Sequence, residues 1–172
     1  MRNLVLVGFM GTGKTVVGQR VAARLGLAFV DMDQVIAQRA GRSISEIFAT
    51  DGEAHFRQLE RALVRELAAQ QGQVIATGGG VVLDPANLRD FARQGVIICL
   101  WCEPEVIYER TKHARHRPLI EETDRRQRVA ALLRERAPLY QAIPLRVDNT
   151  QTTVEQDVES VLRLYRDQAT RP

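Results

Sequence analysis

The most constraining feature of the sequence is a glycine-rich segment that lies between an apolar run and a helix-like pattern. Residues 8–15 read G-F-M-G-T-G-K-T, which fits the pattern G-x-x-x-x-G-K-[ST]. The apolar run at residues 3–7 predicts a buried parallel strand. After Lys14, apolar residues recur at helical spacing up to Gly26, where we expect the helix to end. A strand, a glycine-rich turn and a helix in this order predict a phosphate-binding loop.

The residue types in this loop suit nucleotide phosphates. Glycines let backbone N–H groups approach phosphate oxygens without a Cβ atom in the way, and the next helix presents its positive N-terminal end to the same anion. Lys14 can reach the β- and γ-phosphates, and the Thr15 hydroxyl can ligate Mg²⁺. A chance match in a glycine-containing turn is the alternative. We predict that the nucleotide is bound by Gly11, Thr12, Gly13, Lys14, Thr15 and Val16.

Length and composition favour one globular domain. A chain of 172 residues predicts a single domain, residues 1–172. The net charge of +3 is too small to indicate nucleic-acid binding, and no apolar run is long enough to span a membrane. The first apolar stretch is interpreted as a strand rather than a signal peptide, so we expect a cytoplasmic protein. A monomer is the default expectation.

The two cysteines, Cys99 and Cys102, have C-x-x-C spacing. Redox motifs of this kind normally expose the first thiol where a strand gives way to a helix. Here Cys99 lies within an apolar strand pattern, which favours buried, structural thiols over a redox or zinc site.

Strand and helix patterns alternate along the rest of the chain. Further strands are predicted at residues 27–30, 73–77, 96–101 and 145–148. Helices are expected from residue 34 onward and at 43–48, 53–71, 85–93, 104–112, 123–136 and 154–166, with a break at residues 51–52 and a helix end at residues 137–140. This alternation predicts a mainly parallel sheet with helices on both faces.

Two carboxylates follow the second predicted strand, where open α/β sheets bind ligands. Asp31 and Asp33 suggest a metal role for one and contact with an acceptor hydroxyl for the other. Capping of the next helix is the alternative for Asp33. Further along, Arg57 and Glu60 are three residues apart on a predicted helix and can pair, although a solvated ion pair is the common outcome.

Two loops complete the set of candidate features. Gly78, Gly79 and Gly80 follow a predicted strand, which indicates that a group approaches the backbone closely, or else a flexible loop. Residues 110–117 are rich in Arg, Lys and His and lack an apolar stripe. We interpret this segment as a mobile lid that supplies an arginine to the transferring phosphoryl group. A solvated charge cluster is the alternative, and the spacing of His113 and His116 does not indicate a metal site without further ligands.

Taken in order, these features resemble the shikimate kinase family over residues 3–148. The motifs that carry the resemblance are D-M-D at 31–33, G-E at 52–53 with F-R-Q-L-E at 56–60, T-G-G-G at 77–80, R-P-L at 117–119 and R-A-P-L-Y at 136–140. The resemblance implies a five-stranded parallel sheet of the P-loop nucleoside-monophosphate-kinase type. It also implies a mobile lid at about residues 110–122 and substrate-binding helices at about residues 33–71.

The resemblance further implies transfer of the ATP γ-phosphoryl group to the 3-hydroxyl of shikimate, in aromatic amino-acid biosynthesis. Lys14, Asp33 and Arg117 would then be catalytic, with Arg110 and Arg117 at the nucleotide. Mg²⁺ would be held by Thr15 and Asp31, and Glu60 would fix Arg57. Shikimate would contact Asp33, Phe48, Phe56, Arg57, Gly78, Gly79, Gly80 and Arg136.

One segment departs from the family pattern. Relatives commonly have an arginine or a proline in the loop after the last strand, whereas residues 148–153 have neither. No adenine-contacting residue is therefore assigned there. Two alternatives remain open: another small-molecule P-loop kinase, acting on gluconate or a nucleoside monophosphate, and a non-catalytic shikimate-kinase-like module that senses a ligand.

Overall fold

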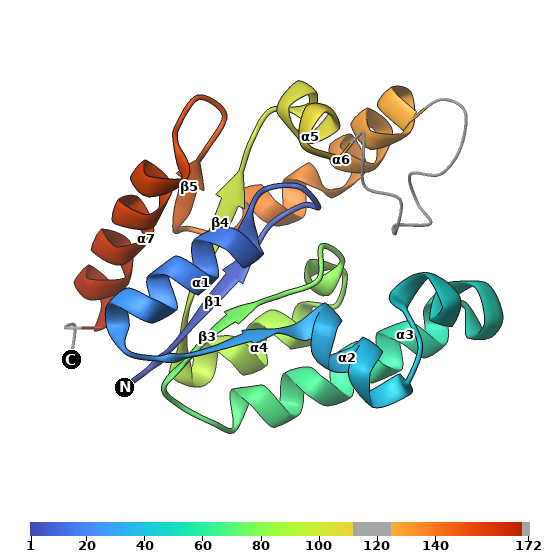
Figure 1. Cartoon of the computed structure of the whole chain (residues 1–172), viewed down its shortest axis with the longest axis horizontal. Helices are drawn as coiled ribbons and strands as arrows, with labels where there is room; N and C mark the ends of the chain where they lie inside the picture. The colour runs from blue at the N-terminus through green and yellow to red at the C-terminus, as the bar shows by residue number, and fades with distance from the viewer. Residues whose placement is uncertain (112–124, 170–172) are drawn as a thin grey trace.

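The computed structural model describes residues 1–111 and 125–169 of the chain (Figure 1). Its five strands form one sheet in the order β2-β3-β1-β4-β5, and every neighbouring pair is parallel. The strands are β1 (Asn3–Val7), β2 (Ala28–Asp31), β3 (Gln73–Ala76), β4 (Gly95–Trp101) and β5 (Arg146–Asp148). The predicted five-stranded parallel sheet is confirmed.

Helices cover both faces of this sheet. They are α1 (Lys14–Leu25), α2 (Met32–Ala40), α3 (Ile44–Ala68), α4 (Pro85–Gln94), α5 (Pro104–Thr111), α6 (Arg125–Gln141) and α7 (Val154–Ala169), with a short 3₁₀ helix, η1 (Val81–Leu83). Figure 1 shows α1 and α7 side by side on one face, while α3, α4 and α6 supply the core of the other. Among the described residues, no helix is both long enough and apolar enough to cross a membrane.

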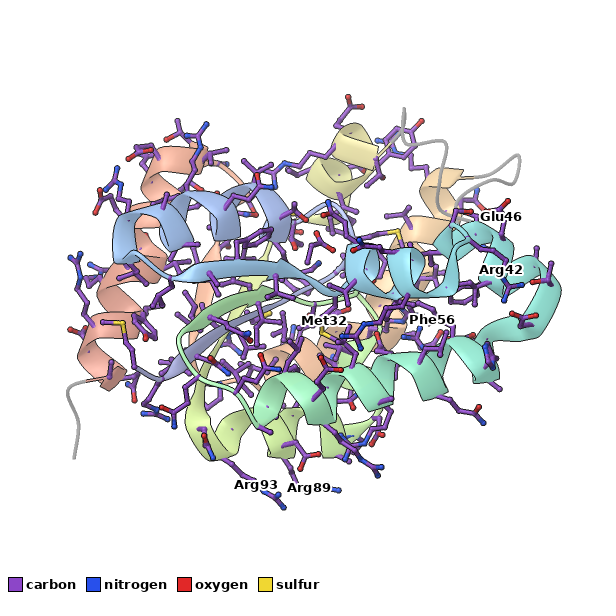
Figure 2. The ribbon with its side chains drawn as sticks, turned by 60° about the horizontal axis from the view of Figure 1, so that its bottom comes forward. Met32, Arg42, Glu46, Phe56, Arg89 and Arg93 are labelled. Carbon is purple, nitrogen blue, oxygen red and sulfur yellow. The ribbon has the colours of Figure 1, made fainter. Side chains whose placement is uncertain are left out.

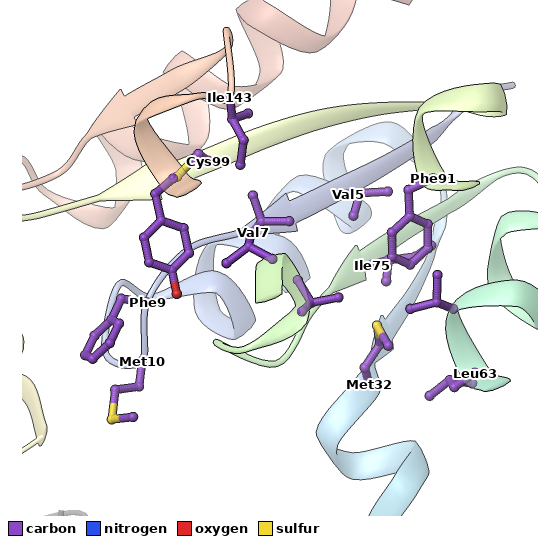
Figure 3. Packing of buried hydrophobic residues seen from close by; sticks show 14 of the residues in the cluster. Val5, Val7, Phe9, Met10, Met32, Leu63, Ile75, Phe91, Cys99 and Ile143 are labelled. Atoms are coloured by element: carbon purple, nitrogen blue, oxygen red, sulfur yellow. The ribbon is translucent and has the colours of Figure 1, made fainter. Parts of the chain in front are cut away.

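Alternation along β1 divides the core into two clusters. Leu4 and Leu6 pack under α1 and α7, whereas Val5 and Val7 face the other cluster. Figure 3 shows Val5 near Ile75 and Phe91, and Val7 nearer Cys99 and Ile143, within the same cluster. All five β1 residues are buried, as expected for a central parallel strand covered on both faces. The glycine-rich loop therefore leaves the most constrained strand of the sheet.

The helix predictions need two corrections. The two helices expected at residues 43–48 and 53–71 are assigned as one, α3, although Gly52 has a non-helical φ of 80° and kinks it at the predicted break. The helix expected to end at 137–140 instead continues through Pro138 to Gln141. Because Pro138 lies in the last turn, its missing N–H removes only one helical hydrogen bond. Tyr140, which is fully buried, anchors that turn against the sheet.

Both thiols are buried, as predicted for structural cysteines. Burial raises the pKa of Cys99 to about 12 and the pKa of Cys102 to about 11. Few thiolates form at neutral pH under these conditions, and the thiolate is the reactive form. The C-x-x-C spacing therefore reflects two residues of a buried strand end rather than a redox site.

Candidate active site

The glycine-rich loop lies at the carboxyl end of β1, the middle strand of the sheet. Gly8, Gly11 and Gly13 have φ values of 148°, 78° and 87°, which side-chain-bearing residues rarely adopt. A Cβ at Gly8 would lie 2.3 Å from the carbonyl oxygen of Leu100. All three positions therefore need glycine for their conformation, and Gly8 needs it for space as well. Gly13 caps α1 and, within the described residues, supplies no side-chain hydrogen bond to its first turn. The N-terminal end of a helix directs N–H groups toward an anion.

Lys14 is buried and lies against the loop itself. Its Nζ donates to the carbonyl oxygens of Gly8 at 2.8 Å and Phe9 at 2.9 Å. Only 8% of the residue is exposed. The Lys14 ammonium group is therefore held against the glycine-rich loop, where the G-x-x-x-x-G-K-[ST] pattern places it.

Thr15 and Asp31 meet at the junction of α1 and β2. The Thr15 hydroxyl donates to Asp31 Oδ2 at 2.7 Å, and Asp31 Oδ1 accepts from the backbone N–H groups of Asp33 and Gln34. Asp31 is therefore the N-cap of α2, and the alternative that Asp33 caps this helix is wrong. The reason is that Asp31 ends the extended strand directly before the first helical residue.

This hydroxyl–carboxylate pair fits a magnesium ion. Mg²⁺ prefers oxygen ligands and usually takes only one or two protein carboxylates, with waters and phosphates completing its shell. In the described part of the chain, no cluster of three or more His, Cys, Asp and Glu residues has metal-site geometry. The residues present thus fit a metal that is shared with a nucleotide rather than one enclosed by the protein.

Arg57 and Glu60 form a partly buried ion pair on α3. Arg57 Nη1 lies 2.7 Å from Glu60 Oε2, and the Glu60 side chain is only 2% exposed. Nη2 of the same guanidinium donates a hydrogen bond to Glu53 Oε1 at 3.0 Å. Burial raises the pKa of Glu60, and the positive charge of Arg57 opposes that rise. The alternative of a solvated surface pair is wrong here, because the carboxylate lies under the turn that follows β3.

The turn at residues 78–80 passes directly over these charged groups. A Cβ at Gly78 would lie 2.9 Å from Asp33 Oδ1 and 3.0 Å from Glu60 Oε1, and one at Gly80 would lie 2.2 Å from Arg57 Nη2. The glycines therefore let these side chains approach the backbone closely, which is the first of the two interpretations that the sequence offered for residues 78–80. The Cβ position of Gly79 lies 3.3 Å from the backbone nitrogen of Met10, so the same turn touches the phosphate loop.

Arg136 reaches this group of residues from α6. It is 6% exposed, and its charge acts on Glu60 and on the Tyr140 phenol. Tyr140 in turn donates to the carbonyl oxygen of Gly79 at 2.5 Å. Among the described residues, buried Arg136 Nε has no hydrogen-bond partner, which is unusual for a guanidinium and leaves a donor for a ligand.

Two phenylalanines form an apolar wall next to Arg57. The rings of Phe48 and Phe56 lie 4.8 Å apart, and the Arg57 guanidinium lies 5.1 Å from the centre of the Phe56 ring. Figure 2 shows Phe56 on the side of α3 that faces α2. The predicted acceptor residues described by the structure are thus brought together from α2, α3, α6 and the turn after β3.

The nucleotide side contains one residue that the sequence analysis did not single out, Asn149. The predicted residue Arg110 donates to both oxygens of Asn149, at 3.3 Å to Oδ1 and 3.1 Å to the carbonyl oxygen. Arg110 also lies 3.5 Å from the carbonyl oxygen of Gly11. Asn149 Nδ2 donates to the carbonyl oxygen of Thr12 at 2.7 Å. The position of Asn149 just after β5, at the carboxyl edge of the sheet, was the available signal.

The remaining predicted nucleotide residues are only partly described. Val16 is 46% exposed. Arg117, His113 and His116 lie outside the described residues.

A hollow of about 730 Å³ opens elsewhere, beside the start of β4, and none of the predicted site residues that the structure describes lines it. It lies at the amino end of the strands, whereas parallel α/β sheets bind ligands at the carboxyl end. The chemistry of the side chains, rather than the volume of a cavity, therefore locates the candidate site.

Comparison with known proteins agrees with this geometry. The shikimate kinase family model matches residues 10–166. The shikimate kinase of Pelotomaculum thermopropionicum is 44% identical over 167 residues, which cover 97% of each chain. Shikimate kinase from Acinetobacter baumannii, solved in complex with shikimate, aligns with a TM-score of 0.93 at 31% identity, covering 99% of this chain and 96% of the other. A gluconokinase from Sinorhizobium meliloti 1021 aligns with a TM-score of 0.65 at 17% identity, covering 98% and 93%, and shares the fold alone. This chain belongs to the shikimate kinase family.

Proposed function

We propose that this chain transfers the γ-phosphoryl group of ATP to the 3-hydroxyl of shikimate, giving shikimate 3-phosphate and ADP for aromatic amino-acid biosynthesis. Membership of the family makes it an ATP-dependent kinase that acts on shikimate. The observation that carries the residue assignments is the turn at 78–80. This turn contacts Asp33, Glu60 and Arg57 on one side and Met10 of the phosphate loop on the other. Acceptor and phosphate donor would therefore meet at one point.

The acceptor half suits a hydroxylated ring with one carboxylate. Arg57 and Arg136 would bind that carboxylate, because guanidinium groups match carboxylates with two parallel hydrogen bonds. Glu60 would hold Arg57 in place. Asp33 would accept a hydrogen bond from the 3-hydroxyl and take up its proton, while Gly78, Gly79 and Gly80 offer backbone groups and Phe48 and Phe56 pack on the ring.

The donor half would work by positioning and charge. Lys14 and the N–H groups of residues 11–16 would hold the phosphates, and Arg117 would approach them as residues 110–122 close. Thr15 and Asp31 would hold Mg²⁺, which neutralises phosphate charge when bound. Phosphoryl transfer depends mainly on such alignment and electrostatic stabilisation rather than on covalent catalysis. We also propose that the protein is a cytoplasmic monomer that binds neither nucleic acid nor membranes.

The reaction is tested by measuring ADP release from Mg·ATP with shikimate, gluconate or AMP as acceptor. We expect turnover with shikimate alone. Turnover with gluconate or AMP instead would contradict the roles of Arg57 and Arg136. Nucleotide binding without turnover on any acceptor would indicate a ligand-sensing module.

The role of Asp33 is tested by Asp33→Asn, which keeps the size of the side chain and removes its basicity. We expect turnover to fall by about 100-fold or more, the usual range for a general base, while MgADP affinity is unchanged. Near-normal turnover would remove Asp33 from the proton transfer.

A further inference from the structure

We propose that Asn149 is a positioning residue that orients the phosphate loop and holds Arg110 beside it. The proposal rests on the proposed binding of ATP at residues 11–16. It assigns a role in the segment after β5, where the sequence had indicated none.

Asn149 bridges three parts of the nucleotide side. Its backbone N–H donates to the carbonyl oxygen of Trp101 at 2.8 Å, which ties it to the end of β4. Its side-chain amide donates to the Thr12 carbonyl oxygen at 2.7 Å. Its two oxygens accept from the Arg110 guanidinium. Only 1% of the residue is exposed, so water does not compete for these contacts.

The contact with Thr12 sets the direction of a phosphate donor. A trans peptide is planar, and its C=O and N–H groups point in opposite directions. Holding the Thr12 carbonyl toward Asn149 therefore directs the N–H of Gly13 to the opposite side of the peptide. Gly13 has a φ of 87° and can rotate easily in either sense. A fixed partner for Thr12 thus keeps a flexible glycine peptide in the orientation that binds an anion.

An asparagine meets both requirements at once. The carbonyl oxygen of Thr12 needs a donor, and the Arg110 guanidinium needs an acceptor. Aspartate offers only acceptors when ionised, and leucine of similar size offers neither group. The two contacts therefore depend on the side-chain amide, and the loss of either group should act on nucleotide binding through Thr12 or Arg110.

Asn87 serves as a matched control, because it is a buried asparagine with similar hydrogen bonds that lie away from the phosphate loop. Asn87 on α4 is also buried, at 2% exposed. Its Nδ2 donates to the Val81 carbonyl oxygen at 3.0 Å and its Oδ1 accepts from Arg61 at 3.3 Å. The same chemistry thus occurs away from the phosphate loop. Asn87→Leu should lower the melting temperature without changing nucleotide affinity.

The test compares Asn149→Leu, Asn149→Ala and Asn87→Leu with the unchanged protein in binding of MgADP and of inorganic pyrophosphate. We expect both Asn149 variants to bind both ligands about tenfold more weakly, the effect of losing one well-placed hydrogen bond. If Asn149→Leu does not fold, Asn149→Ala alone tests the proposal. Arg110→Ala should itself weaken binding, because Arg110 lies at the phosphate loop. Adding Asn149→Leu to Arg110→Ala should weaken pyrophosphate binding further, because the Thr12 contact is then lost as well.

Steady-state kinetics separates positioning from general destabilisation. Phosphate contacts made equally in the ground and transition states change KM and leave kcat unchanged. The KM for ATP should therefore rise in both Asn149 variants, with kcat and the KM for shikimate unchanged.

Wild-type affinity for both ligands in the Asn149 variants, or an equal loss in Asn87→Leu, would overturn the proposal. If Asn149→Leu causes no further loss of pyrophosphate affinity when added to Arg110→Ala, Asn149 acts only through Arg110 and the proposed orientation of the Thr12 peptide is overturned. If the unchanged protein binds neither ligand, the proposed nucleotide site itself fails.

Discussion

A single methyl group at residue 80 would test how strictly the acceptor site depends on the position of Arg57. In Gly80→Ala the new Cβ would lie 2.2 Å from Arg57 Nη2, 2.5 Å from Nη1 and 2.6 Å from Cζ. Contacts become ordinary at 3.4 Å, so the guanidinium has to move by about 1.2 Å. Because this group is the far end of a flexible side chain, the arginine moves and the backbone stays.

The expected loss is large for function and small for stability. Displacing a positioning group by about 1 Å can cost about 100-fold, or about 2.7 kcal/mol. Gly80 has φ −94° and ψ 3°, a conformation that alanine also adopts. The change in unfolding free energy should therefore stay within about 1 kcal/mol. We expect kcat/KM for shikimate to fall by about 100-fold, while the KM for ATP is unchanged.

The decisive assay is a double-mutant cycle with Arg57→Ala. If the methyl group acts through Arg57, adding Gly80→Ala to Arg57→Ala should cause little further loss. Additive losses would show that residue 80 acts by another route. Wild-type shikimate kinetics in Gly80→Ala would refute the proposed role of the Arg57 guanidinium. Thermal melting of each variant serves as the control for folding.

Two further predictions use the ionisation of buried groups. Because burial raises the pKa of Glu60, its contribution to stability is complete below the unfolded pKa of about 4.3 and is lost as pH rises through the folded value. Urea unfolding at several pH values should therefore show Glu60→Gln gaining stability relative to the wild type as pH rises from about 4 to 7; a constant difference would contradict this. Because the thiol pKa values of Cys99 and Cys102 are raised to about 12 and about 11, the native protein should resist iodoacetamide at about pH 8 and react at both cysteines in denaturant. Labelling of the native protein at the rate of a free thiol would disprove their burial.

The central strand and the loop after it could be predicted because their signals are local. A run of apolar residues, glycines at fixed spacing and a lysine followed by threonine specify strand, turn and helix within twenty residues. The spacing of Arg57 and Glu60 was equally visible. Their burial was not, because it depends on a turn at residues 78–80 that lies about twenty residues further along the chain.

In other parts of the site the local signal was too coarse to assign a role to a single residue. Asp31 and Asp33 both lie near the start of α2. Which of them caps the helix depends on the residue at which β2 ends, and the sequence pattern does not fix that residue. Asn149 follows a strand of three residues, and its partners are more than thirty residues away in sequence. Pro138 normally ends a helix, but the burial of Tyr140 two residues later favours one more turn.

The pairing of α5 with α6 connects the two proposed binding sites. Buried Ile107 of α5 and Val129 of α6 belong to one core cluster, so these helices pack against each other. An exposed ion pair between Glu105 and Arg126 adds a surface contact. Arg110 extends from α5 to the phosphate loop, and Arg136 extends from α6 into the acceptor group. A nucleotide that fixes the position of α5 would also fix α6, and so would prepare the acceptor site before shikimate arrives. By thermodynamic linkage, shikimate must then tighten nucleotide binding by the same factor.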